Sequence, residues 1–307
     1  MPLAPEIKAF LDASAAAGLP QVWEAPVEVL RRNTQNRIVF AGPAEPLFEI
    51  SNRFIPGPTA DLPIRIYRPN ADTNRTIVYF HGGGWVLNFL DIYDASLSRL
   101  ANQSNATIIS VNYQKAPEHP FPIPFDDCYA TLLWVIANAK QIGVSTDRLG
   151  VAGDSAGGNL AAAVALKARD NGIQLAFQIL VYPCNDLDFE SDSYQVNATG
   201  YGLSTQAMQW FWKQYLQTSD HYENPYAVPA RAKSFAQTAP AVIITAQYDP
   251  LLSDGEKYAE LLNRDGVMTS YRCYEGMIHG FFTHAAMTPV AGRAIDFVAQ
   301  EVVRLTQ

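Results

Sequence analysis

One serine stands between glycines in the segment G-D-S-A-G, residues 153–157. The apolar run 149–152 predicts a buried strand and the Ala-rich run 156–169 predicts a helix, with no loop between them. A strand that turns directly into a helix needs glycine where the backbone is crowded. Such a turn exposes the Ser155 hydroxyl beside a helix N-terminus, as in the nucleophile elbow of serine acyl-transfer enzymes.

A second motif, H-G-G-G-W at residues 81–85, follows the apolar run 76–80. Consecutive glycines let the backbone approach a substrate and turn several N–H groups toward one point. In acyl transfer that point is the oxyanion, the negative charge that develops on the carbonyl oxygen. We expect Gly82 and Gly83, together with the Ala156 N–H, to donate to it. A glycine turn without a ligand is the structural alternative.

A serine hydroxyl is too weakly acidic to attack alone, so it needs a general base and an acid that orients the base. His279 is the predicted base because it follows the last predicted strand, 268–274, and is flanked by Gly276 and Gly280. The other histidines are placed less well: His81 in the glycine motif, His119 in a proline-rich loop, His221 in an insertion and His284 near the closing helix.

Asp249 is the predicted orienting acid, since it follows shortly after the apolar run 241–246 and is itself followed by proline. One helix and one strand separate it from His279, so both residues should lie on the same edge of a parallel sheet. Asp254 and Asp186 are the alternatives. Asp254 fits better in the first turn of a helix, and Asp186 begins the insertion.

The rest of the chain supplies the elements that position these residues. Strand patterns at 47–55, 62–67, 76–80, 107–111, 149–152, 175–182, 241–246 and 268–274 mostly alternate with helical patterns at 125–139, 156–169, 255–264 and 293–305. Alternation of this kind predicts a mostly parallel sheet covered on both faces and opened by an antiparallel pair. Residues 5–17 and 27–32 predict N-terminal helices, and a helix beginning after Ser204 interrupts the alternation.

Composition limits the classes of partner. The net charge of −8 disfavours nucleic acid, and no apolar run predicts stable membrane insertion. Three widely spaced cysteines and a start without a basic segment indicate a cytoplasmic protein with free thiols. We expect a small-molecule substrate and no metal or cofactor, and a homodimer remains open.

These motifs resemble those of the hormone-sensitive-lipase-like esterases, bacterial family IV. The resemblance rests on H-G-G-G-W, V-N-Y-Q-K-A-P-E-H-P-F-P, G-D-S-A-G-G-N-L-A, Y-D-P-L-L-S-D-G and H-G-F, and covers nearly the whole chain. It implies an α/β-hydrolase fold with a helical cap, and a cofactor-free carboxylesterase acting on small or short-acyl esters. It also marks Ser155, Asp249 and His279 as the catalytic triad. We assign residues 1–45 to N-terminal cap helices, 46–184 and 226–307 to the hydrolase core, and 185–225 to a cap insertion.

The sequence departs from the usual family pattern D-Y-R-L-A-P-E at Asn112, Gln114 and Lys115. Leu252 and Ser253 also replace residues that are commonly charged in the family. These changes bear on substrate preference and stability and leave the proposed chemistry intact.

Several other residues have weaker predicted roles. Candidates for lining the acyl and alcohol pockets, with core packing as the alternative, are Trp85, Tyr113, Tyr182, Leu203 and Phe211. Asp154 is expected to order the elbow, and Glu118 and Asp127 to form ion pairs or caps. An amidase, a lactonase, a lyase or an acyltransferase would share the elbow and the oxyanion motif. A non-catalytic small-molecule receptor on the same fold would instead have a damaged triad.

Overall fold

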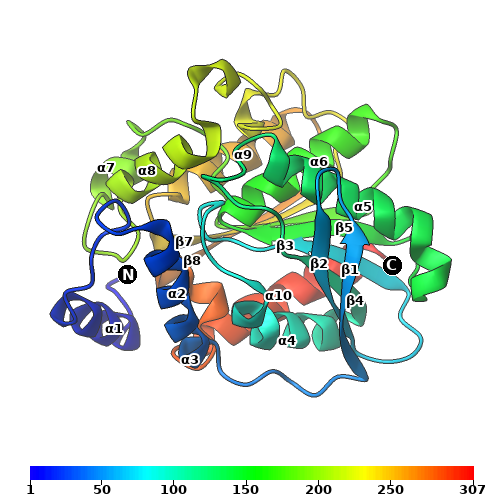
Figure 1. Ribbon diagram of the computed structural model, residues 1–307, viewed down its shortest axis with the longest axis horizontal. Coiled ribbons are helices and arrows are strands. Elements are labelled where there is room, and N and C mark those ends of the chain that lie inside the picture. Colours follow the sequence, from blue (N-terminus) through cyan, green and yellow to red (C-terminus); the bar gives the residue numbers. More distant parts are fainter.

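The computed structural model describes all 307 residues, with eight strands in a single sheet in the order β1-β2-β4-β3-β5-β6-β7-β8 (Figure 1). The strands are β1 (Glu49–Pro56), β2 (Asp61–Arg68), β3 (Arg75–Phe80), β4 (Ala106–Val111), β5 (Leu149–Asp154), β6 (Phe177–Val181), β7 (Ala241–Tyr248) and β8 (Thr269–Ile278). β2 runs antiparallel to both of its neighbours, and all the later pairs are parallel. The predicted mostly parallel sheet with an antiparallel opening is confirmed.

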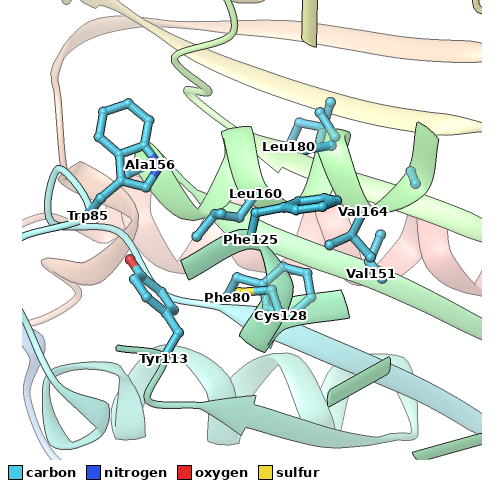
Figure 2. Packing of buried hydrophobic residues seen from close by; sticks show 14 of the residues in the cluster. Phe80, Trp85, Tyr113, Phe125, Cys128, Val151, Ala156, Leu160, Val164 and Leu180 are labelled. Carbon is cyan, nitrogen blue, oxygen red and sulfur yellow. The ribbon is translucent and has the colours of Figure 1, made fainter. Parts of the chain in front are cut away.

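Helices cover both faces of the sheet (Figure 1). α5 (Ile123–Ile142), α6 (Ala156–Asp170) and α9 (Leu252–Arg264) contribute to one buried apolar cluster, and α4 (Asp94–Ser104) and α10 (Pro289–Leu305) contribute to the other. Figure 2 shows part of the first cluster, where Phe125, Leu160 and Val164 pack above the strands. Since both faces are covered, β4 and β5 are buried along their entire length.

The helix α4 was not among the elements predicted from the sequence. Its residues D-A-S-L-S-R-L-A-N-Q-S are largely polar, yet Leu97, Leu100 and Ala101 form an apolar stripe that faces the core. β3 and β4 pair in parallel, and parallel neighbours require a crossover connection. The sequence between those two strands therefore had to contain one.

Two groups of shorter helices lie outside this framework. Before β1 come α1 (Pro5–Ala16), α2 (Val27–Asn33), the 3₁₀ turn η1 (Thr34–Arg37) and α3 (Ile38–Ala41). Between β6 and β7 come α7 (Asp192–Val196), α8 (Thr205–Leu216) and the short 3₁₀ turns η3 (Ser219–His221) and η4 (Pro229–Arg231). Ser204 caps α8 through its hydroxyl, which accepts a hydrogen bond from the Ala207 N–H. None of the helices is both long enough and apolar enough to span a membrane.

Candidate active site

The turn between β5 and α6 places Ser155 at the end of the central strands. Ser155 adopts φ 55° and ψ −121°, a strained conformation for a residue with a side chain. Its glycine neighbours make room for this turn. A Cβ atom on Gly153 would lie 2.1 Å from the Gly157 carbonyl oxygen, and one on Gly157 would lie 1.9 Å from the Phe80 carbonyl oxygen. Ser155 therefore projects from a tightly packed elbow.

Three side chains from three strand ends form a continuous hydrogen-bonded chain. The Ser155 Oγ lies 2.9 Å from His279 Nε2, and His279 Nδ1 lies 2.7 Å from Asp249 Oδ2. A carboxylate only accepts, so Nδ1–H donates to Asp249 and Nε2 is left to accept the Ser155 hydroxyl. Asp249 is fully buried, and its other oxygen accepts the Leu251 N–H at 2.9 Å.

The alternative acids do not reach the imidazole of His279. Asp254 lies in the first turn of α9, where its Oδ2 accepts the Asp186 N–H at 3.3 Å. Asp186 in turn pairs with Lys257 and Arg231. Burial raises the pKa of Asp254 well above its usual range.

Two other histidines, the buried His81 and the half-buried His284, have different surroundings. His81 stacks on Tyr113 with ring centroids 4.5 Å apart, and burial lowers its pKa to about 3. His284 packs against Phe10 and Phe40, and burial lowers its pKa to about 3 as well. Both imidazoles are therefore neutral at ordinary pH.

The glycine motif corrects one expectation about the oxyanion donors. The Gly82 N–H donates to Asp154 Oδ1 at 2.8 Å and lies 3.0 Å from the Tyr93 hydroxyl oxygen, so it is not free to bind an oxyanion. The N–H groups of Gly83 and Gly84 have no acceptor within the chain. Ala156 begins α6, so its N–H also lacks an intrahelical partner. The available donors are thus Gly83, Gly84 and Ala156.

Asp154 connects the elbow to the glycine motif. Its carboxylate accepts hydrogen bonds from the Gly82 N–H, the Tyr79 hydroxyl at 2.9 Å and the Tyr93 hydroxyl at 3.2 Å. Burial raises its pKa to about 6, against the opposing effect of these three donors. The sequence placed Asp154 near the elbow, but its partners are distant in the chain and no local pattern could identify them.

The predicted pocket residues divide into two groups. Phe211 packs against the glycine motif, since a Cβ on Gly84 would lie 2.1 Å from its ring, and the Tyr182 ring centroid is 4.6 Å from that of His279. Tyr182 therefore borders the hydrogen-bonded chain, and Phe211 borders the glycine motif.

Trp85, Tyr113 and Leu203 have packing contacts instead. Trp85 is fully buried and stacks on Tyr215 of α8 with centroids 4.3 Å apart (its indole is seen in Figure 2). The Tyr113 hydroxyl donates to the His81 carbonyl, and Leu203 packs on the larger apolar cluster. For Trp85 and Tyr113 the alternative of core packing describes the structure better than an acyl or alcohol pocket.

Known proteins are similar to this chain over most of its length. A family model described as the alpha/beta hydrolase fold matches residues 77–283. The arylesterase of Saccharolobus solfataricus is 35% identical over 92% of each chain, and the carboxylesterase NlhH of Mycobacterium tuberculosis is 40% identical over 76% of this chain and 75% of its own length.

Solved structures of esterases are also similar to this chain in fold. A thermostable esterase from Pseudomonas putida has a TM-score of 0.95 and 32% identity, covering 100% of this chain and 98% of its own. A hyperthermophilic esterase from Pyrobaculum calidifontis has a TM-score of 0.92 and 36% identity, covering 99% of both chains. The chain therefore belongs to the alpha/beta hydrolase fold family, among its hormone-sensitive-lipase-like carboxylic ester hydrolases, as its motifs predicted.

Proposed function

We propose that this carboxylic ester hydrolase cleaves small or short-acyl esters through an acyl-enzyme formed on Ser155. The observation that carries the proposal is the hydrogen-bonded chain from Ser155 through His279 to Asp249. A relative named ethyl acetate hydrolase, from Pseudomonas putida, is 31% identical over 98% of both chains and supports a small ester as substrate.

In the proposed mechanism, His279 removes the proton from the Ser155 hydroxyl as its oxygen attacks the ester carbonyl. The tetrahedral intermediate collapses, the ester C–O bond breaks, and the alcohol leaves with the proton held by His279. Water then attacks the acyl-enzyme, again giving its proton to His279, and the acid departs as Ser155 is regenerated. Asp249 keeps the imidazole in the required tautomer and stabilises its cationic form.

The negative charge on the carbonyl oxygen needs donors that are already in position. We assign this role to the N–H groups of Gly83, Gly84 and Ala156, which have no partners of their own. Asp154 is a positioning residue in this scheme. By holding the Gly82 N–H it fixes the glycine backbone beside the elbow and leaves the next two N–H groups free.

The helices of residues 1–45 and 185–225 are proposed to form the cap. Contacts between α8 and the glycine motif support this, because Phe211 lies on Gly84 and Trp85 stacks on Tyr215. The side chain of Leu11 in α1 is near Gly202 of the insertion. Phe211 is then the residue proposed to limit acyl length.

The remaining expectations concern the cellular location and the binding partners of the protein. The three free cysteines support a cytoplasmic location, and the net charge of −8 supports the absence of a nucleic-acid partner. A homodimer stays a prediction.

The proposal is tested by turnover of p-nitrophenyl esters of increasing acyl length, with matched amides and lactones and with Ser155→Ala as control. We expect fastest turnover with short acyl esters and a loss on the order of 10⁴- to 10⁶-fold in Ser155→Ala. Faster turnover of an amide or lactone would identify an amidase or lactonase instead. Transfer to added alcohol in preference to water would identify an acyltransferase, and binding without turnover would identify a receptor.

A further inference from the structure

A cavity of about 740 Å³ lies between the N-terminal helices and the segment that follows β4. α2 and η1 contribute Arg31, Arg32 and Gln35 to its lining, and the segment 112–119 contributes most of the rest. Its lining includes Asn88, whose side chain would lie 2.9 Å from a Cβ placed on Gly83. The cavity therefore adjoins the glycine motif on which the oxyanion donors lie.

The charge in this cavity is opposite to that of the whole protein. Three cationic side chains line it, and Glu118 is the one carboxylate. Glu118 is already bound by both nitrogens of the Arg31 guanidinium, at 2.8 and 2.7 Å. Arg32 and Lys115 form no salt bridge. An acidic chain of net charge −8 thus keeps two cations without a salt-bridge partner at this cavity, Lys115 half-buried and Arg32 exposed.

Lys115 is the cation for which an anion would matter most. Its Nζ donates to neutral oxygens, Asn112 Oδ1 at 2.5 Å and the Tyr113 carbonyl at 3.2 Å, and lies 5.4 Å from the centroid of the Tyr113 ring. Desolvation by burial, with a smaller effect from the Arg31 charge, lowers the pKa of Lys115 to about 7. An ammonium group without a counter-ion in such surroundings is costly, and a bound anion would remove that cost.

We propose that this cavity binds the carboxylate of a small organic acid, contacted by Lys115 and Arg32. Ester hydrolysis generates a carboxylate at each turnover, so the identity of the anion rests on the proposed function. The carboxylate is either that of the acid product or a second, free carboxylate on the ester substrate. The chemistry recognised is the same in both cases.

Binding is tested without turnover, by calorimetric titration of the full chain with sodium butyrate at pH 6 and constant ionic strength. Sodium chloride is the control for a nonspecific salt effect. We expect Lys115→Met to weaken butyrate binding about tenfold or more, because a hydrogen bond between two charged groups is lost. Arg32→Gln should weaken binding less. The matched substitutions Lys140→Met and Arg53→Gln, at exposed positions outside the cavity, should leave it unchanged. Equal affinity in Lys115→Met and the parent would overturn the proposal.

The parent protein offers a second test that needs no variant. Affinity for butyrate should fall as pH rises from about 6 to about 8.5, since Lys115 then loses its proton while the carboxylate stays ionised. The charged and titratable groups acting on Lys115 are Arg31 of α2, Asp127 and Cys128 of α5, Glu118 of its own segment and His81, which stays neutral. Affinity that is constant over this range would contradict a site built on Lys115.

Kinetics distinguish the two sources of the carboxylate. If it is the product, butyrate inhibits hydrolysis of p-nitrophenyl butyrate and Lys115→Met relieves the inhibition. If it belongs to the substrate, the p-nitrophenyl monoester of succinate has a higher kcat/KM than the butyrate ester, and Lys115→Met removes the difference. Butyrate that binds without either effect would refute the link to the reaction. Butyrate binding is also measured in the inactive Ser155→Ala variant. Binding that is retained there tests the carboxylate site independently of the proposed hydrolysis.

Discussion

Replacing Asp154 tests whether a buried carboxylate positions the oxyanion donors. Asp154→Ala removes the acceptor of the Gly82 N–H together with the acceptors of two tyrosine hydroxyls. Asp154→Asn keeps one oxygen that can still accept from Gly82. Tyr79→Phe is a matched control, because it removes a hydrogen bond to Asp154 without touching the glycine motif.

The magnitudes follow from these contacts. Loss of one oxyanion donor costs on the order of 10²- to 10³-fold in kcat, and a glycine backbone freed at Gly82 should misplace at least one. We therefore expect Asp154→Ala to lower kcat by about 10²-fold with KM changed less than about threefold. Asp154→Asn should lose less than about tenfold, and Tyr79→Phe less than about threefold.

The stability of Asp154→Asn relative to the parent should depend on pH. The pKa of Asp154 is raised from 3.8 to about 6, so its protonated form is favoured in the folded state. Its contribution to folding is full below pH 3.8 and is lost as pH rises through 6, a change of about 3 kcal/mol. Asp154→Asn lacks this titration. The free energy of unfolding of Asp154→Asn relative to the parent should therefore rise by up to that amount between about pH 4 and 7.

The assay combines steady-state kinetics on p-nitrophenyl butyrate with the affinity for a trifluoromethyl ketone, whose adduct places an oxyanion at the same donors. Ketone affinity should fall in parallel with kcat across the variants. Urea unfolding at each pH gives the stability difference. Asp154→Ala with parental kcat and ketone affinity would refute the positioning role, and a pH-independent stability difference would refute the raised pKa.

Three further outcomes are expected from the same structure. Asp249→Asn should fold normally and lose roughly 10³- to 10⁴-fold in kcat, whereas Asp254→Asn should lose less than about tenfold; the reverse order in a kinetic comparison would move the orienting acid to α9. Phe211→Ala should shift preference toward longer acyl esters more than it shifts the melting temperature, and equal slowing of all esters would make the residue part of the core. Gly84→Ala should lower kcat strongly, because its Cβ would overlap the Phe211 ring, and Phe211→Ala should partly rescue it; no rescue would contradict that packing.

Much of the architecture could be predicted because it depends on local patterns. The G-D-S-A-G turn, the apolar strands and the spacing of Asp249 and His279 each carry their information within at most one βαβ unit. Those residues are brought together in the structure as the spacing predicted. The helix α4 escaped prediction because serine and asparagine interrupt its apolar stripe, and all three of its serines are buried.

The details that the sequence could not supply depend on contacts between distant residues. Gly82 and Gly84 look alike in the motif, and only the position of Asp154, 72 residues away, shows that the Gly82 N–H is occupied. The position of Trp85 after the glycine motif fits either a pocket or the core, and only the stacking of Tyr215 from α8 distinguishes the two. Local patterns thus identify the reactive groups, while long-range packing decides which backbone groups are free to act.

The most direct test of the central claim is to identify the residue that attacks the substrate, by labelling it covalently. A p-nitrophenyl phosphonate ester is incubated with the protein, and the labelled peptide is identified by mass spectrometry. A single label on Ser155, absent from Ser155→Ala and formed much more slowly in Asp249→Asn, is the predicted result. A label on another residue, or ester hydrolysis that continues after complete labelling of Ser155, would contradict the claim that this serine is the nucleophile.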